Sequence, residues 1–207
     1  MEYITILEQY FKELPLFVRE HSERVGTYAQ VLVKQLKSLQ KTGYFSDLKL
    51  PVQVPVNLLG RYHDIGKTGV DSKLWNSTGL FDNELRSLAN THTIIGAHLV
   101  RRKLWLPERE TSHSELRDII TDCCLYPHER WDGGGYPFGL KGDRIPFYAR
   151  LIAIADSYDA MMADRPYHVG ISSEEALQEI RREAGKQFDP DLAEAFCMSW
   201  QARVKAV

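Results

Sequence analysis

Cysteine is scarce in this sequence, with 3 residues among 207. Cys123 and Cys124 are neighbours and Cys197 stands far from them, so no C-x-x-C spacing for a metal or redox motif exists. An odd count without such spacing indicates reduced thiols, as is usual in a cytosol, and not a disulfide framework. We therefore interpret the three cysteines as small core residues of a cytoplasmic protein.

Long hydrophobic runs are also missing. Charged residues interrupt the first 25 positions, which therefore lack the apolar region of a signal peptide. No segment approaches the roughly 18 consecutive apolar residues that a membrane-spanning helix needs. We expect a soluble protein with no membrane partner.

Neither sign of charge dominates, because 26 Lys and Arg residues face 28 Asp and Glu residues. Such a chain has no net field with which to hold a polyanion, so nucleic acid is not an expected partner. The 43% of hydrophobic residues excludes a disordered chain. A length of 207 residues fits one domain or two small ones. Since no linker or repeat divides the chain, we expect a single domain over residues 1–207.

Apolar residues recur at helical spacing through most of the chain, and no alternating strand pattern persists. Ser172 and Glu175 have the spacing of a helix-starting capping box. Residues 41–54 and the glycine-rich stretch 131–146 are expected to be irregular. The sequence therefore predicts an all-α protein. The expected helices cover about 3–14, 21–40, 55–65, 82–104 with a break near Asn90, 112–126, 147–162, 173–184 and 190–204.

One carboxylate falls in a stretch that is predicted to be buried. Asp156 follows the apolar run LIAIA in the predicted helix RLIAIADSYDAMM. An unpaired buried carboxylate is costly, so Asp156 needs a cation or strong hydrogen-bond donors. The alternative is that Asp156 shares a thin solvent-exposed stripe of this helix with Asp159.

Histidines stand at or near the ends of several other predicted helices. His63 and Asp64 are adjacent, so their side chains point about 100° apart and can grip a metal from two sides. Singly, each candidate has an ordinary alternative: a His-Asp pair often arises by chance, and His21 can cap a helix or lie at the surface. Together, imidazoles and carboxylates suit metals such as iron or manganese. One site, or two sites sharing Asp64, would contain His21, His63, Asp64, His92, His128 and Asp156.

The order of these residues resembles that of the HD superfamily of metal-dependent phosphohydrolases. Longer strings are similar to the HD-GYP subfamily: HSERV at 21–25, HDIGK at 63–67, HERWDGGGYPFGLKGDRIP at 128–146, IADSYDAMMADRPY at 154–167 and GKQFDP at 185–190. The similarity covers about residues 15–200. Resemblance to this subfamily implies an all-helical HD-domain bundle of about seven helices, a site for two or three metal ions, and hydrolysis of cyclic di-GMP to pGpG or GMP.

The resemblance also implies roles for single residues. The six positions given above match the metal ligands of the family. Lys67 and Arg165 match positions that contact the substrate phosphate, and Tyr136 matches a loop tyrosine near the substrate. Two ions ~3.5–4 Å apart would lower the pKa of a bridging water, and the metal-bound hydroxide would attack phosphorus. Asp64 would set the metal spacing as the bridging ligand, while Lys67 and Arg165 would stabilise charge on the phosphate oxygens.

Both cationic residues have structural alternatives. Lys67 can bond the last carbonyl groups of the helix before it. Arg165 can form a surface ion pair with Asp164.

Three positions depart from the pattern that the resemblance implies. Pro127 stands where the first of two adjacent histidines is usual, which weakens a second metal site if that histidine completes it. Phe17 replaces a glutamate four residues before His21, so we expect no third metal. His168 occupies a substrate-binding position that is usually basic, and a histidine is only partly charged at neutral pH.

The sequence is compatible with three functions, of which two are enzymatic and one is a binding function. The first is a metal-dependent phosphodiesterase that acts on a cyclic dinucleotide. The second is a degenerate HD-GYP module that binds nucleotide or a signalling partner without turnover, and hydrolysis of another nucleotide is a third. Retained Asp64, Lys67, Asp156 and Arg165 favour the enzyme, whereas Pro127 favours the binding module. Since we recognise no sensor or receiver segment, regulation is expected through a separate protein such as a diguanylate cyclase, a receiver or a sensor.

Overall fold

The computed structural model describes residues 2–43, 54–75, 82–103, 111–164 and 169–204. These residues form ten α-helices and two 3-10 segments, and they hold no strand beyond one isolated bridge between Ala184 and Phe188. The prediction of an all-α protein is confirmed. The elements are α1 Glu2–Glu13, α2 Leu16–Lys41, α3 Val56–Tyr62, η1 Ile65–Gly69, α4 Ser72–Trp75, α5 Asn83–Asn90, α6 His92–Lys103, α7 Thr111–Leu125, η2 Gly142–Arg144, α8 Phe147–Met162, α9 Ser173–Arg182 and α10 Pro190–Val204.

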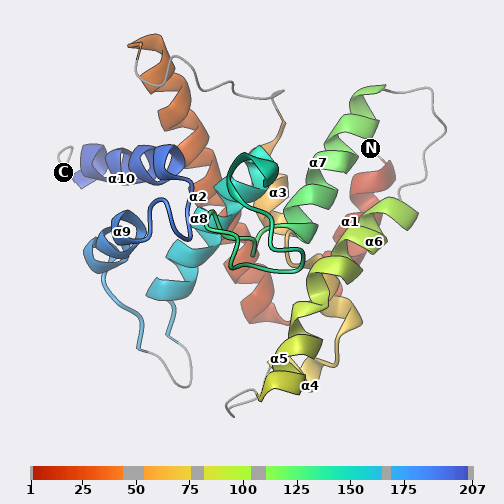
Figure 1. The fold of residues 1–207 in the computed structure, drawn as a ribbon. Coiled ribbons are helices and arrows are strands. Elements are labelled where there is room, and N and C mark those ends of the chain that lie inside the picture. Colours follow the sequence, from red (N-terminus) through yellow and green to blue (C-terminus); the bar gives the residue numbers. More distant parts are fainter. Residues whose placement is uncertain (1, 44–53, 76–81, 104–110, 165–168, 205–207) are drawn as a thin grey trace.

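Helices α2 and α8 run through the middle of the molecule, with α9 and α10 on one side and α5, α6 and α7 on the other (Figure 1). α2 packs against α3, α8 and α10, and α3 also contacts α7 and α8. A continuous hydrophobic core lies among these helices and includes the fully buried Val25, Leu32, Ile152 and Phe196. Polar residues on the inner faces of α2, α3 and α8 therefore share one interior.

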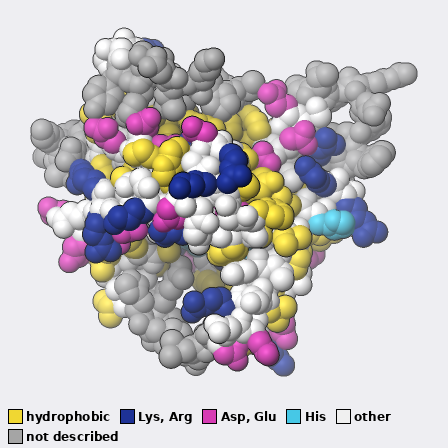
Figure 2. All heavy atoms as spheres, viewed as in Figure 1, with side chains coloured by type: hydrophobic (Ala, Val, Ile, Leu, Met, Phe, Trp, Pro, Cys, Tyr) yellow, Lys and Arg dark blue, Asp and Glu magenta, His cyan; other side chains and the backbone are white. Residues whose placement is uncertain are grey.

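No one type of side chain dominates the described part of the face drawn in Figure 2. Acidic and basic side chains are interspersed there, in keeping with the formal net charge of −2. Among the described helices, none has the length and apolar composition to cross a membrane. The absence of a nucleic-acid partner stays a prediction.

Two helix boundaries differ from those expected. α2 begins at Leu16 and not near His21, because the chain becomes helical directly after Pro15, whose φ of −51° suits the position before a first turn. His21 therefore lies within the helix with its side chain 12% exposed, so the alternatives of a capping or surface histidine are wrong. α3 ends at Tyr62, because the chain then tightens into η1.

Other expected features are confirmed in the parts of the chain that the structure describes. The break near Asn90 separates α5 from α6, and the capping box of Ser172 and Glu175 starts α9 with both reciprocal hydrogen bonds. The helices outnumber the expected seven partly because this break divides one of them and because α4 was not predicted. Most of the irregular segment 41–54 lies outside the described residues.

Helices α2 and α3 touch at their backbones. A Cβ atom on Gly60 would lie 2.4 Å from the Cα of Gly26, and one on Gly26 would lie 2.6 Å from the carbonyl oxygen of Asn57. Only residues without a side chain permit this approach. The contact holds the end of α3, where His63 follows, directly against the N-terminal half of α2, which carries His21.

The Gly60→Ala variant tests this contact. Alanine would normally stabilise a helix by about 1 kcal/mol relative to glycine. Here the added methyl group would meet backbone, so we expect the free energy of unfolding to fall by about 1–3 kcal/mol. Urea denaturation measures the change. Thr27→Ala, at an exposed position of α2 beside Gly26, is the control and should change stability by less than about 0.5 kcal/mol. A Gly60→Ala protein as stable as wild type would contradict the packing argument.

Candidate metal centre

Asp64 lies at the centre of a cluster of histidines. Its carboxylate follows α3 and is 1% exposed. The Nε2 atom of His92, the first residue of α6, lies 3.4 Å from Asp64 Oδ1. The Nε2 atoms of His63 and His21 lie 3.5 and 3.8 Å from Asp64 Oδ2. One carboxylate thus faces three imidazoles that come from α2, the end of α3 and α6.

Asp156 of α8 forms the second centre of this cluster. The Nε2 atom of His21 lies 3.0 Å from Asp156 Oδ1, and that of His63 lies 3.9 Å from the same oxygen. The Nδ1 atom of His128, in the loop after α7, lies 3.7 Å from Asp156 Oδ2. The structure therefore brings together all six residues that the sequence predicted as metal ligands.

Two of the imidazoles, those of His63 and His92, are oriented by hydrogen bonds to main-chain oxygens. His63 Nδ1 lies 2.6 Å from the carbonyl oxygen of Gly60, and His92 Nδ1 lies 2.7 Å from that of Ala89. Each acceptor is three residues earlier, in the last turn of a helix, where carbonyl groups lack the usual i+4 helical partner. Because a carbonyl oxygen only accepts, Nδ1 carries the proton and the lone pair of Nε2 faces the cluster.

The ligand atoms fall into two groups that share Asp64. In each group, one ligand atom per residue lies within 4.8 Å of the others. His63 Nε2 and Asp64 Oδ1 are buried without a hydrogen-bond partner, which is costly unless a cation lies between them. The residues therefore fit a pair of divalent ions. The groups are His21, His63 and Asp64, and Asp64, His92 and His128.

Burial and neighbouring charges set the protonation of these groups. Burial alone would raise the pKa of Asp64, but Lys67 and the surrounding imidazoles outweigh it and hold that pKa well below its usual range. Burial opposes ionisation of Asp156 as well, yet the hydrogen bond from His21 lowers its pKa. Burial lowers the pKa of His92 to about 3, so its Nε2 is free to bind a metal. The centre offers ionised carboxylates beside a neutral imidazole.

Lys67 reaches this centre from η1. Its Nζ lies 2.5 Å from Asp64 Oδ2 and 5.1 Å from the ring centroid of Trp75. The alternative in which Lys67 only bonds helix-end carbonyl groups is therefore wrong. Arg165 and His168 lie outside the described residues, so their substrate-binding roles stay predictions.

The glycine-rich loop places Tyr136 beside the centre. The buried carboxylate of Glu129 accepts hydrogen bonds from the backbone N–H groups of Phe138 and Leu140, which folds the loop back on itself. A Cβ atom on Gly135 would lie 2.5 Å from the carbonyl oxygen of His128, so only glycine fits there. Tyr136 then stacks on His128, with ring centroids 5.0 Å apart and planes 28° apart.

The comparison with known families agrees with this geometry. Residues 12–192 match the model of the family described as HD domain. The chain belongs to the HD-domain family. A solved structure, that of Bd1817, a HDG"Y"P protein from Bdellovibrio bacteriovorus, has the same fold. It is similar with a TM-score of 0.60 and 18% identity, over 89% of this chain and 52% of the other.

Curated relatives of this HD domain include a cyclic di-GMP phosphodiesterase of Thermotoga maritima, 32% identical over 94% of this chain and 48% of the relative. A 3'3'-cGAMP-specific phosphodiesterase 2 of Vibrio cholerae is 30% identical over 67% of this chain and 25% of the relative. The chain thus spans less than half the length of either relative. This HD domain is related to cyclic-dinucleotide phosphodiesterases.

Sequence reasoning missed two residues beside the metal ligands of the HD domain. Asp159 is 2% exposed, so the alternative of a solvent-exposed stripe on α8 is wrong. Its carboxylate contacts His21 and Arg24 of α2. The only sequence signal was position, since Asp159 lies three residues after Asp156 and so on the same side of the helix.

Two of the positions that depart from the subfamily pattern lie close to candidate ligands along the chain. Pro127 is buried directly before His128, and Phe17 lies on α2 one turn before His21 with 49% of its surface exposed. The group of Asp64, His92 and His128 forms without a histidine at position 127. A weaker second metal and the absence of a third stay predictions.

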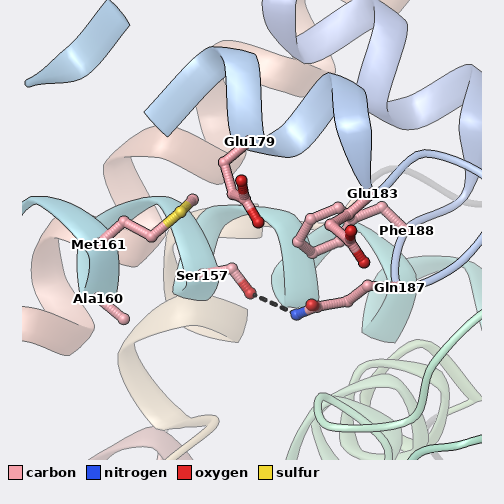
Figure 3. Close-up of a pocket in the computed structure, with 7 residues that line it drawn as sticks. All are labelled: Ser157, Ala160, Met161, Glu179, Glu183, Gln187 and Phe188. Atoms are coloured by element: carbon pink, nitrogen blue, oxygen red, sulfur yellow. Dashed lines mark hydrogen bonds between the residues drawn. The ribbon is translucent and has the colours of Figure 1, made fainter. Parts of the chain in front are cut away.

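A separate cavity of about 340 Å³ lies between α8, α9 and the segment that follows α9 (Figure 3). Glu179 and Glu183 project into it from the side of α9, and Gln187 donates a hydrogen bond to Ser157 across it. Both glutamates form ion pairs, each with Arg182 among its partners. None of the six candidate ligands lines this cavity.

Metal binding to the HD domain should release a proton from His21. Burial would lower the pKa of His21, but hydrogen bonds to Asp156 and Asp159 outweigh it and raise the pKa to about 9 without metal. His21 is then protonated at pH 7 and must lose this proton to bind a metal. Below pH 9, affinity for Mn²⁺ should therefore rise by about tenfold per pH unit.

Calorimetric Mn²⁺ titrations between pH 6.5 and 8.5, in buffers of different ionisation enthalpy, measure the released protons. The His21→Gln variant should release about one proton fewer than wild type at pH 7. Equal proton release by the two proteins would contradict the assignment of this proton to His21.

Proposed function

We propose that this HD domain is a metal-dependent phosphodiesterase that hydrolyses a cyclic dinucleotide, most directly cyclic di-GMP to pGpG or GMP. One observation carries the proposal: two groups of metal-ligand atoms share the buried carboxylate of Asp64. Asp64 would take part in holding both ions, and such a pair would supply a cation for the attacking and for the leaving oxygen of a displacement at phosphorus. The relatives that act on cyclic di-GMP support the choice of substrate.

The nature of the ligands favours iron or manganese. Imidazole nitrogens with carboxylate oxygens, and no thiolate, are typical of borderline first-row metals. Such ions would supply Lewis-acid activation of water and of the phosphate group. The chain itself fixes where this occurs, since Asp64 and Asp156 are held from both sides by histidines whose other nitrogen is engaged in a hydrogen bond.

Other residues of the chain would bind the substrate. Lys67 Nζ contacts the shared carboxylate, so a phosphate held there lies within reach of its charge. Tyr136 covers His128 on the loop side and would pack against the nucleotide while excluding water. Arg165 and His168 follow the end of α8, the helix that carries Asp156, and would contact the phosphate groups.

Hydrolysis by purified protein tests this proposal. Metal content is measured first, and then chromatography follows the products from cyclic di-GMP and from 3'3'-cGAMP with added Mn²⁺ or Fe²⁺. We expect close to two metals per chain and release of pGpG or GMP. Less than one metal per chain with no product from either substrate would overturn the phosphodiesterase. Nucleotide binding without turnover would support the degenerate module instead.

Asp64→Asn should abolish turnover while the protein remains folded. The amide has the same shape but lacks the charge and the second anionic oxygen that a shared ligand needs. Product formation from cyclic di-GMP and the helical circular dichroism signal are measured on the same sample. Turnover at the wild-type rate would contradict the role of Asp64. Loss of helical signal would show that the metal centre holds the fold together.

Lys67→Met tests the proposed contact with phosphate. Methionine keeps an apolar stem of similar size and removes the charge, so kcat should fall by about 10²–10³-fold at unchanged metal content. Steady-state kinetics with metal analysis measure this. Lys73→Met, at an exposed position of α4, is the matched control and should leave kcat unchanged. If both variants have the wild-type kcat, Lys67 does not stabilise the reacting phosphate.

A further inference from the structure

One candidate ligand, His21, is oriented by a charged side chain, whereas His63 and His92 use main-chain oxygens. His21 Nδ1 lies 2.7 Å from Oδ2 of Asp159. Its Nε2 lies 3.0 Å from Oδ1 of Asp156 on the same helix. Two carboxylates of α8 therefore contact the two nitrogens of this imidazole. Asp156 belongs to the cluster of candidate ligands, and Asp159 lies on the opposite side of the ring.

The carboxylate behind His21 is itself fixed by an arginine. Arg24 Nε donates to Asp159 Oδ1 at 2.7 Å, and Arg24 Nη2 donates to Oδ2 at 3.0 Å. This two-point contact matches the planar guanidinium to the plane of the carboxylate. Arg24 follows His21 by one turn of α2, so the three residues form a closed clamp between α2 and α8.

The clamp determines which nitrogen of His21 can bind a metal. An ionised carboxylate held by Arg24 can only accept a hydrogen bond, so His21 Nδ1 must donate. When a metal displaces the proton of Nε2, the lone pair of that nitrogen is directed toward Asp64 and Asp156, as a metal ligand requires. A hydrogen bond to a carboxylate also makes the imidazole a more basic, stronger ligand than a bond to a carbonyl group does.

We propose that Asp159 and Arg24 are positioning residues that set the tautomer and orientation of His21 and so the metal affinity of the group formed by His21, His63 and Asp64. This inference rests on the proposed metal centre. It adds Asp159, which contacts the candidate ligand His21, and Arg24, which contacts Asp159. The other group, formed by Asp64, His92 and His128, has no contact with either residue among the interactions described above and should be largely unaffected.

The Asp159→Asn substitution tests the clamp most directly. Arg24 and His21 both direct N–H groups at Asp159, so an asparagine amide would turn its own N–H₂ group toward one of them. If that group faces His21, Nδ1 must accept and the proton moves to Nε2, the atom that should bind the metal. We expect the affinity of the His21 group for Mn²⁺ to fall about 10–100-fold.

The experiment is a Mn²⁺ titration of the full chain, followed by calorimetry and by electron paramagnetic resonance, which resolve two binding steps. The second group should change affinity by less than about threefold in Asp159→Asn. Arg24→Gln replaces a side chain that is 46% exposed, so it should leave the fold intact and weaken the same step by a smaller factor. Asp143→Asn removes an exposed carboxylate that also pairs with an arginine, and it should change neither step.

The outcomes separate the two proposals. Wild-type protein that binds Mn²⁺ in two steps, with the first weakened in Asp159→Asn and in Arg24→Gln, supports the clamp. Wild-type affinity in both variants would overturn the clamp and leave the phosphodiesterase standing. Equal weakening of both steps would also overturn it, because Asp159 and Arg24 would then be a structural link between α2 and α8. Wild-type protein that binds no Mn²⁺ would overturn the metal centre and the clamp together.

Discussion

Burial of the Asp64 carboxylate is the constraint on which the rest of the interior depends. A charged group with 1% of its surface exposed is tolerated only when cations or donors surround it. Lys67 and three imidazoles supply them, from four different segments of the chain. The ends of α3 and α5, the start of α6 and the N-terminal half of α2 therefore converge at this carboxylate. The same crowding leaves His63 Nε2 and Asp64 Oδ1 without a hydrogen-bond partner, as a metal site would.

Close backbone packing makes this convergence possible. Gly26 and Gly60 let α2 and α3 meet without side chains between them, and a Cβ atom on Gly66 would lie 1.9 Å from the carbonyl oxygen of His92. The second contact joins η1 to the start of α6. Helices separated by ordinary side chains lie about 8–10 Å apart, so their ligands would be less closely grouped. Glycine therefore contributes to the site through distance as well as through loop conformation.

The candidate metal centre of the HD domain is built in layers. Asp64 and the histidines form the inner layer, the main-chain carbonyl groups and Asp159 orient those histidines, and the glycine-rich loop brings Tyr136 to one side. The relatives that act on cyclic dinucleotides are more than twice as long as the matched region. The proposed chemistry therefore rests on residues of this domain.

The sequence by itself determined the helical content and most helix boundaries, because helical periodicity and capping act between residues close along the chain. The candidate ligands followed from their residue types and from the resemblance to the HD family. Only the tertiary structure decided that two ligand groups share Asp64 and that Asp159 is buried behind His21 and paired with Arg24. His21 and Asp159 are 138 positions apart. Burial and hydrogen-bond partners depend on which helices pack together, and no local pattern specifies that.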